Sequence, residues 1–197
     1  MNKLKCLSAA CLVFASACTD QIIDDNTTSR FVTPEANGAI LSPGGATGGF
    51  TDSFGQGYAF KAGSDGDGIA AVAGVIPGTV ATEAPTSGTI RFEGNYQLVS
   101  VGGFFLDDGN VVGISVPVAG PISLNGNFDD GTLRGSADRL SIDGRISGNA
   151  LSGNVEYDGV EGKLTGVIGA NKAVGAFHGN DEDDIYAGGF YATARTD

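Results

Sequence analysis

The chain has 197 residues, of which 41% are hydrophobic, and its 23 acidic against 11 basic side chains give a formal net charge of −12. No basic cluster interrupts this acidity, so the composition excludes a nucleic-acid-binding surface and disfavours contact with anionic membrane surfaces except through an attached lipid. The 33 glycines favour strands joined by tight turns, because glycine costs backbone entropy in a helix and almost no stretch has a sustained helical period.

The first 17 residues have the pattern of an export signal. Lys3 and Lys5 precede an apolar run that is too short to cross a bilayer as a helix, and small residues follow it. The stretch "ASAC" (15–18) resembles a bacterial lipobox, although Ala15 stands where leucine is usual. We predict that residues 1–17 are removed as a lipoprotein signal peptide; ordinary cleavage that leaves a free Cys18 is the alternative.

Cysteine usage favours the lipid. Cys6 and Cys11 leave with the signal, so an exported chain keeps a single unpaired thiol at Cys18, and acylation explains it. Acyl chains such as palmitate hold a protein on a membrane without a spanning helix. Thr19 supplies no acidic retention signal, so we expect a lipid anchor at Cys18 in the outer membrane, with the surface or periplasmic side left open.

Residues 18–49 are polar and rich in Thr, Asn, Gly and Pro. Such a segment buries too little apolar surface to offset the entropy of ordering it. We expect a flexible tether here, to which "FVTP" (31–34) or "AILS" (39–42) adds at most a short strand.

Alternation of apolar and polar residues begins after residue 50. In "TIRFEGNYQLVSV" (89–101) the residues from Ile90 to Leu98 at even positions share one face, which is typical of a half-buried antiparallel strand. "VVGISVPV" (111–118) predicts a second strand, with Pro117 at an edge or a strand end.

The rest of the chain reads as a meander of short strands. We predict turns at "DDG" (129–131), "DG" (143–144) and "DG" (158–159), because Asp-Gly between alternating runs is a strong hairpin signal. Closure removes the exposed edges of such a sheet. The prediction is an all-β fold, an antiparallel up-and-down β-barrel of about eight strands, within residues 50–197.

Three stretches resemble a known family. "PTSGTIRFEGNYQLV" (85–99), "DDGTLRGSADRLSIDGRISGNALSG" (129–153) and "KAVGAFHGNDEDDIYAGGFYAT" (172–193) look like the barrel domain of transferrin-binding-protein-B-like surface lipoproteins. The likeness covers roughly residues 70–194. It rests above all on Gly-x-Phe-x-Gly at 175–179, a short acidic loop, and Gly-Gly-Phe at 188–190, one residue shorter than the family's Gly-Gly-x-Phe.

The resemblance implies an eight-stranded barrel, often preceded by a smaller β-rich handle, on a lipid-anchored protein that binds a host or nutrient ligand. Family members capture transferrin, complement regulators, haemoglobin or haem. Transferrin-binding members carry two lobes, whereas this chain is long enough for one, so two-lobed transferrin capture is not expected.

His178 is the one histidine of the chain and the sharpest candidate ligand residue. An imidazole suits haem as an axial ligand, and a structural histidine at a strand end is the alternative interpretation. The acidic stretches "NDEDD" (180–184) and "SDGDG" (64–68) lack the ligand spacing of a calcium-binding hand and are interpreted as solvated turns. With one histidine and one remaining cysteine, no zinc site is expected.

Catalysis is not expected either. No Gly-x-Ser-x-Gly turn presents a nucleophile, and no spacing singles out a carboxylate pair. We therefore predict a monomeric, non-enzymatic binding protein whose loops 102–110 and 179–186 contact an iron source or protein partner. Phe104 and Phe105 are candidates for an exposed hot spot, with core packing as the alternative. A haem carrier and a structural envelope protein without a ligand are the other functions considered.

Overall fold

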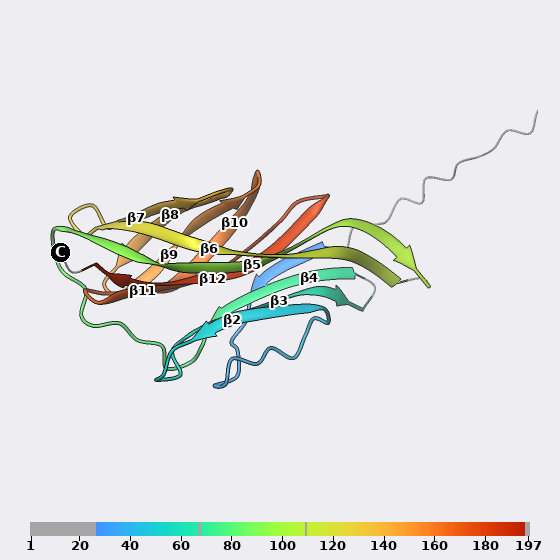
Figure 1. Cartoon of the computed structure of the whole chain (residues 1–197), viewed down its shortest axis with the longest axis horizontal. Helices are drawn as coiled ribbons and strands as arrows, with labels where there is room; N and C mark the ends of the chain where they lie inside the picture. The colour runs from blue at the N-terminus through green and yellow to red at the C-terminus, as the bar shows by residue number, and fades with distance from the viewer. Residues whose placement is uncertain (1–26, 67, 109, 196–197) are drawn as a thin grey trace, which may run out of the picture.

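The computed structural model describes residues 27–195 except 67 and 109, and every regular element in it is a strand. The strands form a four-stranded sheet and a closed eight-stranded barrel, which lie against each other (Figure 1). The sheet contains β1 (Thr27–Phe31), β2 (Ala46–Thr51), β3 (Gly57–Asp65) and β4 (Gly68–Val75). The barrel contains β5 (Thr89–Asp107), β6 (Asn110–Asn127), β7 (Thr132–Ala137), β8 (Leu140–Ser147), β9 (Ala150–Tyr157), β10 (Val160–Ile168), β11 (Lys172–Asn180) and β12 (Asp184–Ala194). No helix long and apolar enough to cross a membrane occurs among the described residues.

The predicted up-and-down barrel is confirmed. Each barrel strand pairs antiparallel with its neighbours in sequence, and β12 closes the barrel on β5 over eleven residue pairs from Asp184↔Gly102 to Ala194↔Phe92. Closure removes the free edges of the barrel strands except along β6, which pairs with β7 only over Ser123–Asn127. Closure is the usual solution for a long meander of this kind.

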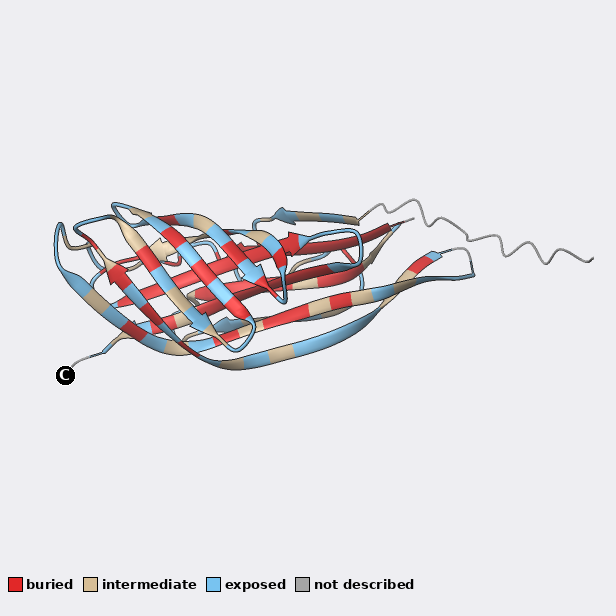
Figure 2. Ribbon diagram, turned by 90° about the horizontal axis from the view of Figure 1, so that it is seen from above, coloured by how far each residue is buried: buried red, intermediate tan, exposed pale blue. Residues whose placement is uncertain are grey.

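Alternating side chains fill the barrel. In β5 the predicted face is confirmed, since Phe92, Tyr96 and Leu98 are each at most 3% exposed and belong to the interior cluster. Figure 2 shows the same alternation of buried and exposed residues along the barrel strands. The interior cluster contains aromatic residues from β5, β9, β11 and β12, so it is a packed core.

The expected handle is the four-stranded sheet, in the order β1-β4-β3-β2. Its inner face packs on the outside of β5, β11 and β12 in a second apolar cluster that includes Tyr58, Phe60 and Ile69 from the sheet and Val101 and Val174 from the barrel. Strands β3 and β4 are buried almost throughout, because the barrel covers one face and neighbouring strands protect their edges.

This sheet corrects the expected tether (residues 18–49) from residue 27 onward. Residues 27–31 form β1, which pairs parallel with β4, and β2 begins at residue 46 and pairs with β3. The expected boundary at residue 50 cuts through β2, and the barrel begins only at residue 89. The tether was inferred from low local apolar content, but β1 and β2 gain their stability by pairing with β3 and β4, which are distant in sequence. The predicted signal peptide and the predicted lipidation site Cys18 lie outside the described residues.

The glycine pair of the closing hairpin has a packing role on both sides of the wall. A Cβ on Gly188 would lie 2.6 Å from the Phe177 ring inside the barrel, and one on Gly189 would lie 2.2 Å from the Tyr58 ring of the covering sheet. Because adjacent strand residues point to opposite faces, the two glycines let an aromatic ring approach from each side.

Two of the three predicted turns are confirmed and one is wrong. Asp158 and Gly159 have φ angles of 54° and 89° and join β9 to β10, as a type I′ turn requires. Asp143 and Gly144 instead lie in the middle of β8, because the alternation from Leu140 runs on through Gly144 without a break. The side chains of Leu151 and Leu133 occupy the space next to Gly144, so this glycine serves packing.

Candidate functional site

The β5–β6 hairpin reaches beyond the rest of the barrel. Strand β12 stops pairing with β5 at Asp184↔Gly102, whereas β5 and β6 remain paired as far as Asp107↔Asn110, past a bulge between Gly102 and Phe105. Among the described residues, the resulting two-stranded ribbon lies at the end of the molecule opposite the C-terminus, and much of its length is exposed (Figures 1 and 2).

One face of this ribbon is an exposed apolar row. Cross-strand pairing places Phe105 opposite Val112, and Ile114 and Val116 continue the same face towards buried Ile122 and Leu124. Phe105, Ile114 and Val116 are 49%, 64% and 50% exposed. We call Phe105, Val112, Ile114 and Val116 the hairpin row. It prolongs the barrel's interior face to where no facing strands cover it.

The other face of the ribbon packs on the core only in part, since Leu106, Ser115 and Pro117 on that face are exposed. Phe104 packs against the cluster between sheet and barrel, and a Cβ on Gly113 would lie 2.9 Å from its ring. The hydroxyl of Ser64 in β3 donates to the carbonyl of Val111, 3.3 Å away, which ties the ribbon to the sheet. Of the two predicted hot-spot residues, Phe105 is therefore exposed, while Phe104 is partly buried beneath the ribbon.

Carboxylates surround the base of the hairpin row. The Asp184 carboxylate occupies the space beside Gly102, with an oxygen 2.1 Å from where a Cβ would be, and Gly102 pairs with Ile114 of the row. Burial raises the pKa of Asp184 above its ordinary value, and the charges of Asp181, Asp183 and Asp158 add to this effect. Two separate turns, β9–β10 and β11–β12, therefore bring negative charge to the same end of the barrel.

The β11–β12 turn is built by its own side chains. Asp181 accepts hydrogen bonds from the backbone N–H groups of Asp183 and Asp184 at 3.0 and 2.8 Å, and its own N–H donates to the Asp184 carbonyl. The acidic loop predicted as a solvated turn is thus a compact hydrogen-bonded turn. No group of three or more His, Cys, Asp or Glu suited to a metal ion occurs in the part of the chain that is described.

His178 lies on the outer wall of the barrel beneath β1. Its ring is 4.4 Å from the Phe31 ring, measured between centroids, and its Nδ1 is 2.8 Å from the Ser29 hydroxyl oxygen, which also lies 2.6 Å from the Asn180 side-chain oxygen. The residue is 7% exposed. Burial, and secondarily the Lys163 ammonium, lowers the pKa of His178 to about 4. The neutral ring thus holds β1 against β11.

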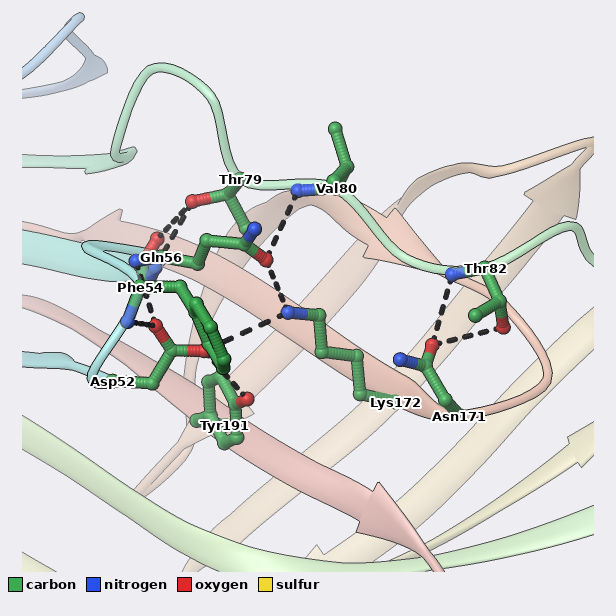
Figure 3. Close-up of polar contacts among 10 residues, drawn as sticks. Asp52, Phe54, Gln56, Thr79, Val80, Thr82, Asn171, Lys172 and Tyr191 are labelled. Carbon is green, nitrogen blue, oxygen red and sulfur yellow. Dashed lines mark hydrogen bonds and ion pairs between the residues drawn. The ribbon is translucent and has the colours of Figure 1, made fainter.

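A second polar cluster joins sheet and barrel at the β2–β3 turn (Figure 3). The Lys172 ammonium contacts the Gln56 side-chain oxygen and lies 3.7 Å from an Asp52 oxygen that also accepts from the Tyr191 hydroxyl at 3.0 Å. Burial tends to raise the pKa of Asp52, but hydrogen bonds from Gln56, Phe54 and Tyr191, with the Lys172 charge, bring it below its ordinary value.

This cluster borders a surface cavity of about 360 Å³. Phe54 and Val80 line it and are 84% and 60% exposed. Because Lys172 is already paired with Asp52 and Gln56, the cluster is best explained as a clamp between the two sheets.

The sequence pattern does not identify the hairpin row as an exposed surface. "VVGISVPV" predicts a strand, but this prediction does not say that its apolar residues are exposed. The pattern that indicates such a surface is a run of apolar residues at consecutive positions, because it places apolar side chains on both faces of the strand. The structure does not bring His178 into contact with Phe105, because they occupy opposite faces of the wall.

Comparisons with known proteins support the fold. Intact Ap-TbpB, with its N and C lobes, aligns over 80% of this chain with 14% identity and a TM-score of 0.50. The isotype 1 transferrin binding protein B from serogroup B Neisseria meningitidis aligns over 79% with 12% identity and a TM-score of 0.47, and the haemoglobin receptor HpuA from Kingella denitrificans over 53% with 17% identity and a TM-score of 0.33.

The chain spans about two fifths of the length of these three proteins, of which it covers 40%, 36% and 42%. No protein-family model and no curated protein sequence matches it. The identities are low, so the alignment with Ap-TbpB shows the fold alone, and this fold agrees with the resemblance read from the glycine pattern.

Proposed function

With a transferrin-binding-protein-B-like fold as the premise, we propose that this chain is a lipid-anchored outer-membrane protein that binds a protein partner through the β5–β6 hairpin. The observation that carries the proposal is the hairpin row: Phe105, Ile114 and Val116 are about half exposed or more on a ribbon that reaches past the barrel. Large apolar side chains gathered on a projecting element mark an interaction surface.

The proposed role is binding without catalysis. The barrel fixes the base of the ribbon on the β5 side, because β5 pairs with β12 as far as Gly102, whereas β6 pairs with β7 only from Ser123 onward. A rigid scaffold that presents a short exposed segment reduces the entropy lost on association. A transferrin binding protein B and a haemoglobin receptor are among the structural neighbours, so transferrin and haemoglobin are the first partners to test.

The binding experiment compares three proteins by surface plasmon resonance with transferrin and haemoglobin. Ile114→Thr with Val116→Thr removes apolar surface but keeps β-branched residues in the strand. Leu41→Gln with Val80→Thr removes exposed apolar side chains elsewhere, since these residues are 85% and 60% exposed. We expect saturable binding that weakens at least about tenfold in the hairpin variant alone. Equal binding by the hairpin variant would refute this site.

The anchor is tested separately. We expect radiolabelled palmitate to enter the full chain in a bacterial host and to be lost with Cys18→Ser, because the thiol carries the diacylglyceryl group. Protease treatment of intact cells then distinguishes the surface from the periplasmic side. Label that persists in the serine variant would contradict the lipid, and sedimentation of the detergent-solubilised chain tests the proposed monomer.

A further inference from the structure

The charge around the hairpin row restricts what can bind it. The Asp184 carboxylate lies beside Gly102, the residue that pairs with Ile114 of the row. Asp107 and Asp108 are exposed at the tip of the same ribbon. The apolar row therefore has carboxylates at the tip of the ribbon and beside Ile114.

Neighbouring turns extend this negative border. Asp158 of the β9–β10 turn contributes to the raised pKa of Asp184, so the two groups lie within range of each other's charge. Arg139 of the β7–β8 turn is engaged already, because its guanidinium pairs with Asp158 and lies 3.9 Å from Asp138. The cation is thus neutralised locally and leaves the border acidic.

We propose that the partner of the hairpin row is a protein surface in which apolar side chains alternate with lysine or arginine. This inference rests on the proposed function and names the chemistry of the partner. An extended segment is well matched, because its apolar side chains on one side cover the row. The long lysine or arginine side chains between them reach around the edge of the segment to the carboxylates that border the row. The border supplies specificity and a faster encounter, and the row supplies most of the affinity.

Two other occupants fit the charge less well. A second copy of the chain would bring its own acidic border against this one, since the formal net charge is −12. An anionic bilayer would meet Asp107 and Asp108 first, at the tip of the ribbon. Both cases put like charges together, which costs binding free energy.

The test uses the full chain in detergent and three synthetic peptides of about eight residues, long enough to match the exposed ribbon. The first alternates valine with lysine, the second valine with glutamate, and the third serine with lysine. Fluorescence anisotropy of labelled peptides gives Kd at low and high sodium chloride. Two variants accompany the wild type: the hairpin variant Ile114→Thr with Val116→Thr, and an acid variant Asp107→Asn with Asp108→Asn and Asp184→Asn.

The acid variant has a matched control. Asp108→Asn suits the positive φ of 50° at this position, because asparagine also adopts the left-handed conformation, so the tip is preserved. Glu83→Gln with Asp129→Asn and Asp130→Asn removes the same charge near the opposite end of the barrel, where residue 170 pairs with Glu83 and Gly88 with Asp129. We expect the valine–lysine peptide to bind saturably, about fivefold more weakly to the acid variant and unchanged to this control.

Each outcome separates the inference from the function on which it rests. Binding of the valine–lysine peptide that falls at least about tenfold in high salt and in the hairpin variant supports both. Equal binding of the valine–glutamate peptide overturns the basic partner but leaves the hairpin as a binding surface. Equal binding of the serine–lysine peptide, indifferent to the hairpin variant, overturns the hairpin itself. Self-association or binding to anionic vesicles through Ile114 and Val116 would replace the proposed partner.

Discussion

Protonation of His178 should weaken the packing of β1 on the barrel. The ring lies against Phe31, with Nδ1 2.8 Å from the Ser29 hydroxyl oxygen and Lys163 opposite it on β10. Burial is the main reason that its pKa falls from the ordinary 6.5 to about 4, and the Lys163 charge contributes. The unfolded chain takes up this proton at a higher pH than the folded chain does. The corresponding stability is therefore fully present above pH 6.5 and is lost as the pH falls towards 4.

The size of the effect follows from the shift. A displacement from 6.5 to about 4 corresponds to at most about 3 kcal/mol of unfolding free energy, since one pKa unit is about 1.4 kcal/mol. His178 lies near the surface, under a single short strand, so solvent screening reduces the expected value to about 1–2 kcal/mol. Most of this loss should appear between pH 6.5 and 4.5.

Two measurements check this reasoning. His178 is the one histidine of the chain, so its ring protons give a single titration curve by NMR. Urea unfolding at pH 7 and 4.5 is compared between the wild type and His178→Asn, because the carboxylates titrate equally in both and cancel. We expect an NMR midpoint near 4, moved upwards by Lys163→Met, and a larger loss of stability in the wild type. A midpoint near 6.5, with equal losses of stability in both proteins, would refute the burial of His178 beneath β1.

Three further outcomes are expected. Lys172→Met should lower the unfolding free energy by about 2–3 kcal/mol, since it leaves Asp52 partly buried without its cation. A double-mutant cycle with Asp52→Asn, measured by urea unfolding, should show a coupling energy of about 1 kcal/mol or more between the two residues. Additive losses of stability would contradict the proposed contact between sheet and barrel. Gly189→Ala should lower the unfolding free energy, measured by calorimetry, by about 1–3 kcal/mol, because the new Cβ would lie 2.2 Å from the Tyr58 ring. An unchanged melting temperature would show that the small sheet does not pack on Gly189 in this way. Haem titration at neutral pH should give no Soret shift that depends on His178 while β1 covers the ring; a shift lost in His178→Ala would favour the haem carrier.

Alternation made the barrel predictable from sequence. Phe92, Tyr96 and Leu98 share one face by position alone, and closure follows from a long meander that must remove its edges. The Asp158–Gly159 turn was equally clear, because its positive φ angles are local requirements. The same dipeptide at Asp143–Gly144 forms no turn, because the pairing of β8 with its neighbouring strands outweighs a local turn preference.

The sequence by itself determined an acidic, all-β chain and the order of its barrel strands, because strand period and turn chemistry act between residues close in sequence. Only the tertiary structure decided which apolar residues are covered. Phe104 and Phe105 are adjacent and chemically identical, yet the small sheet packs on the side of one and nothing described covers the other. His178 is covered by β1, about 150 positions earlier in the chain, as the pairing with Ser29 shows. Burial depends on such distant contacts, and no local pattern in the sequence specifies them.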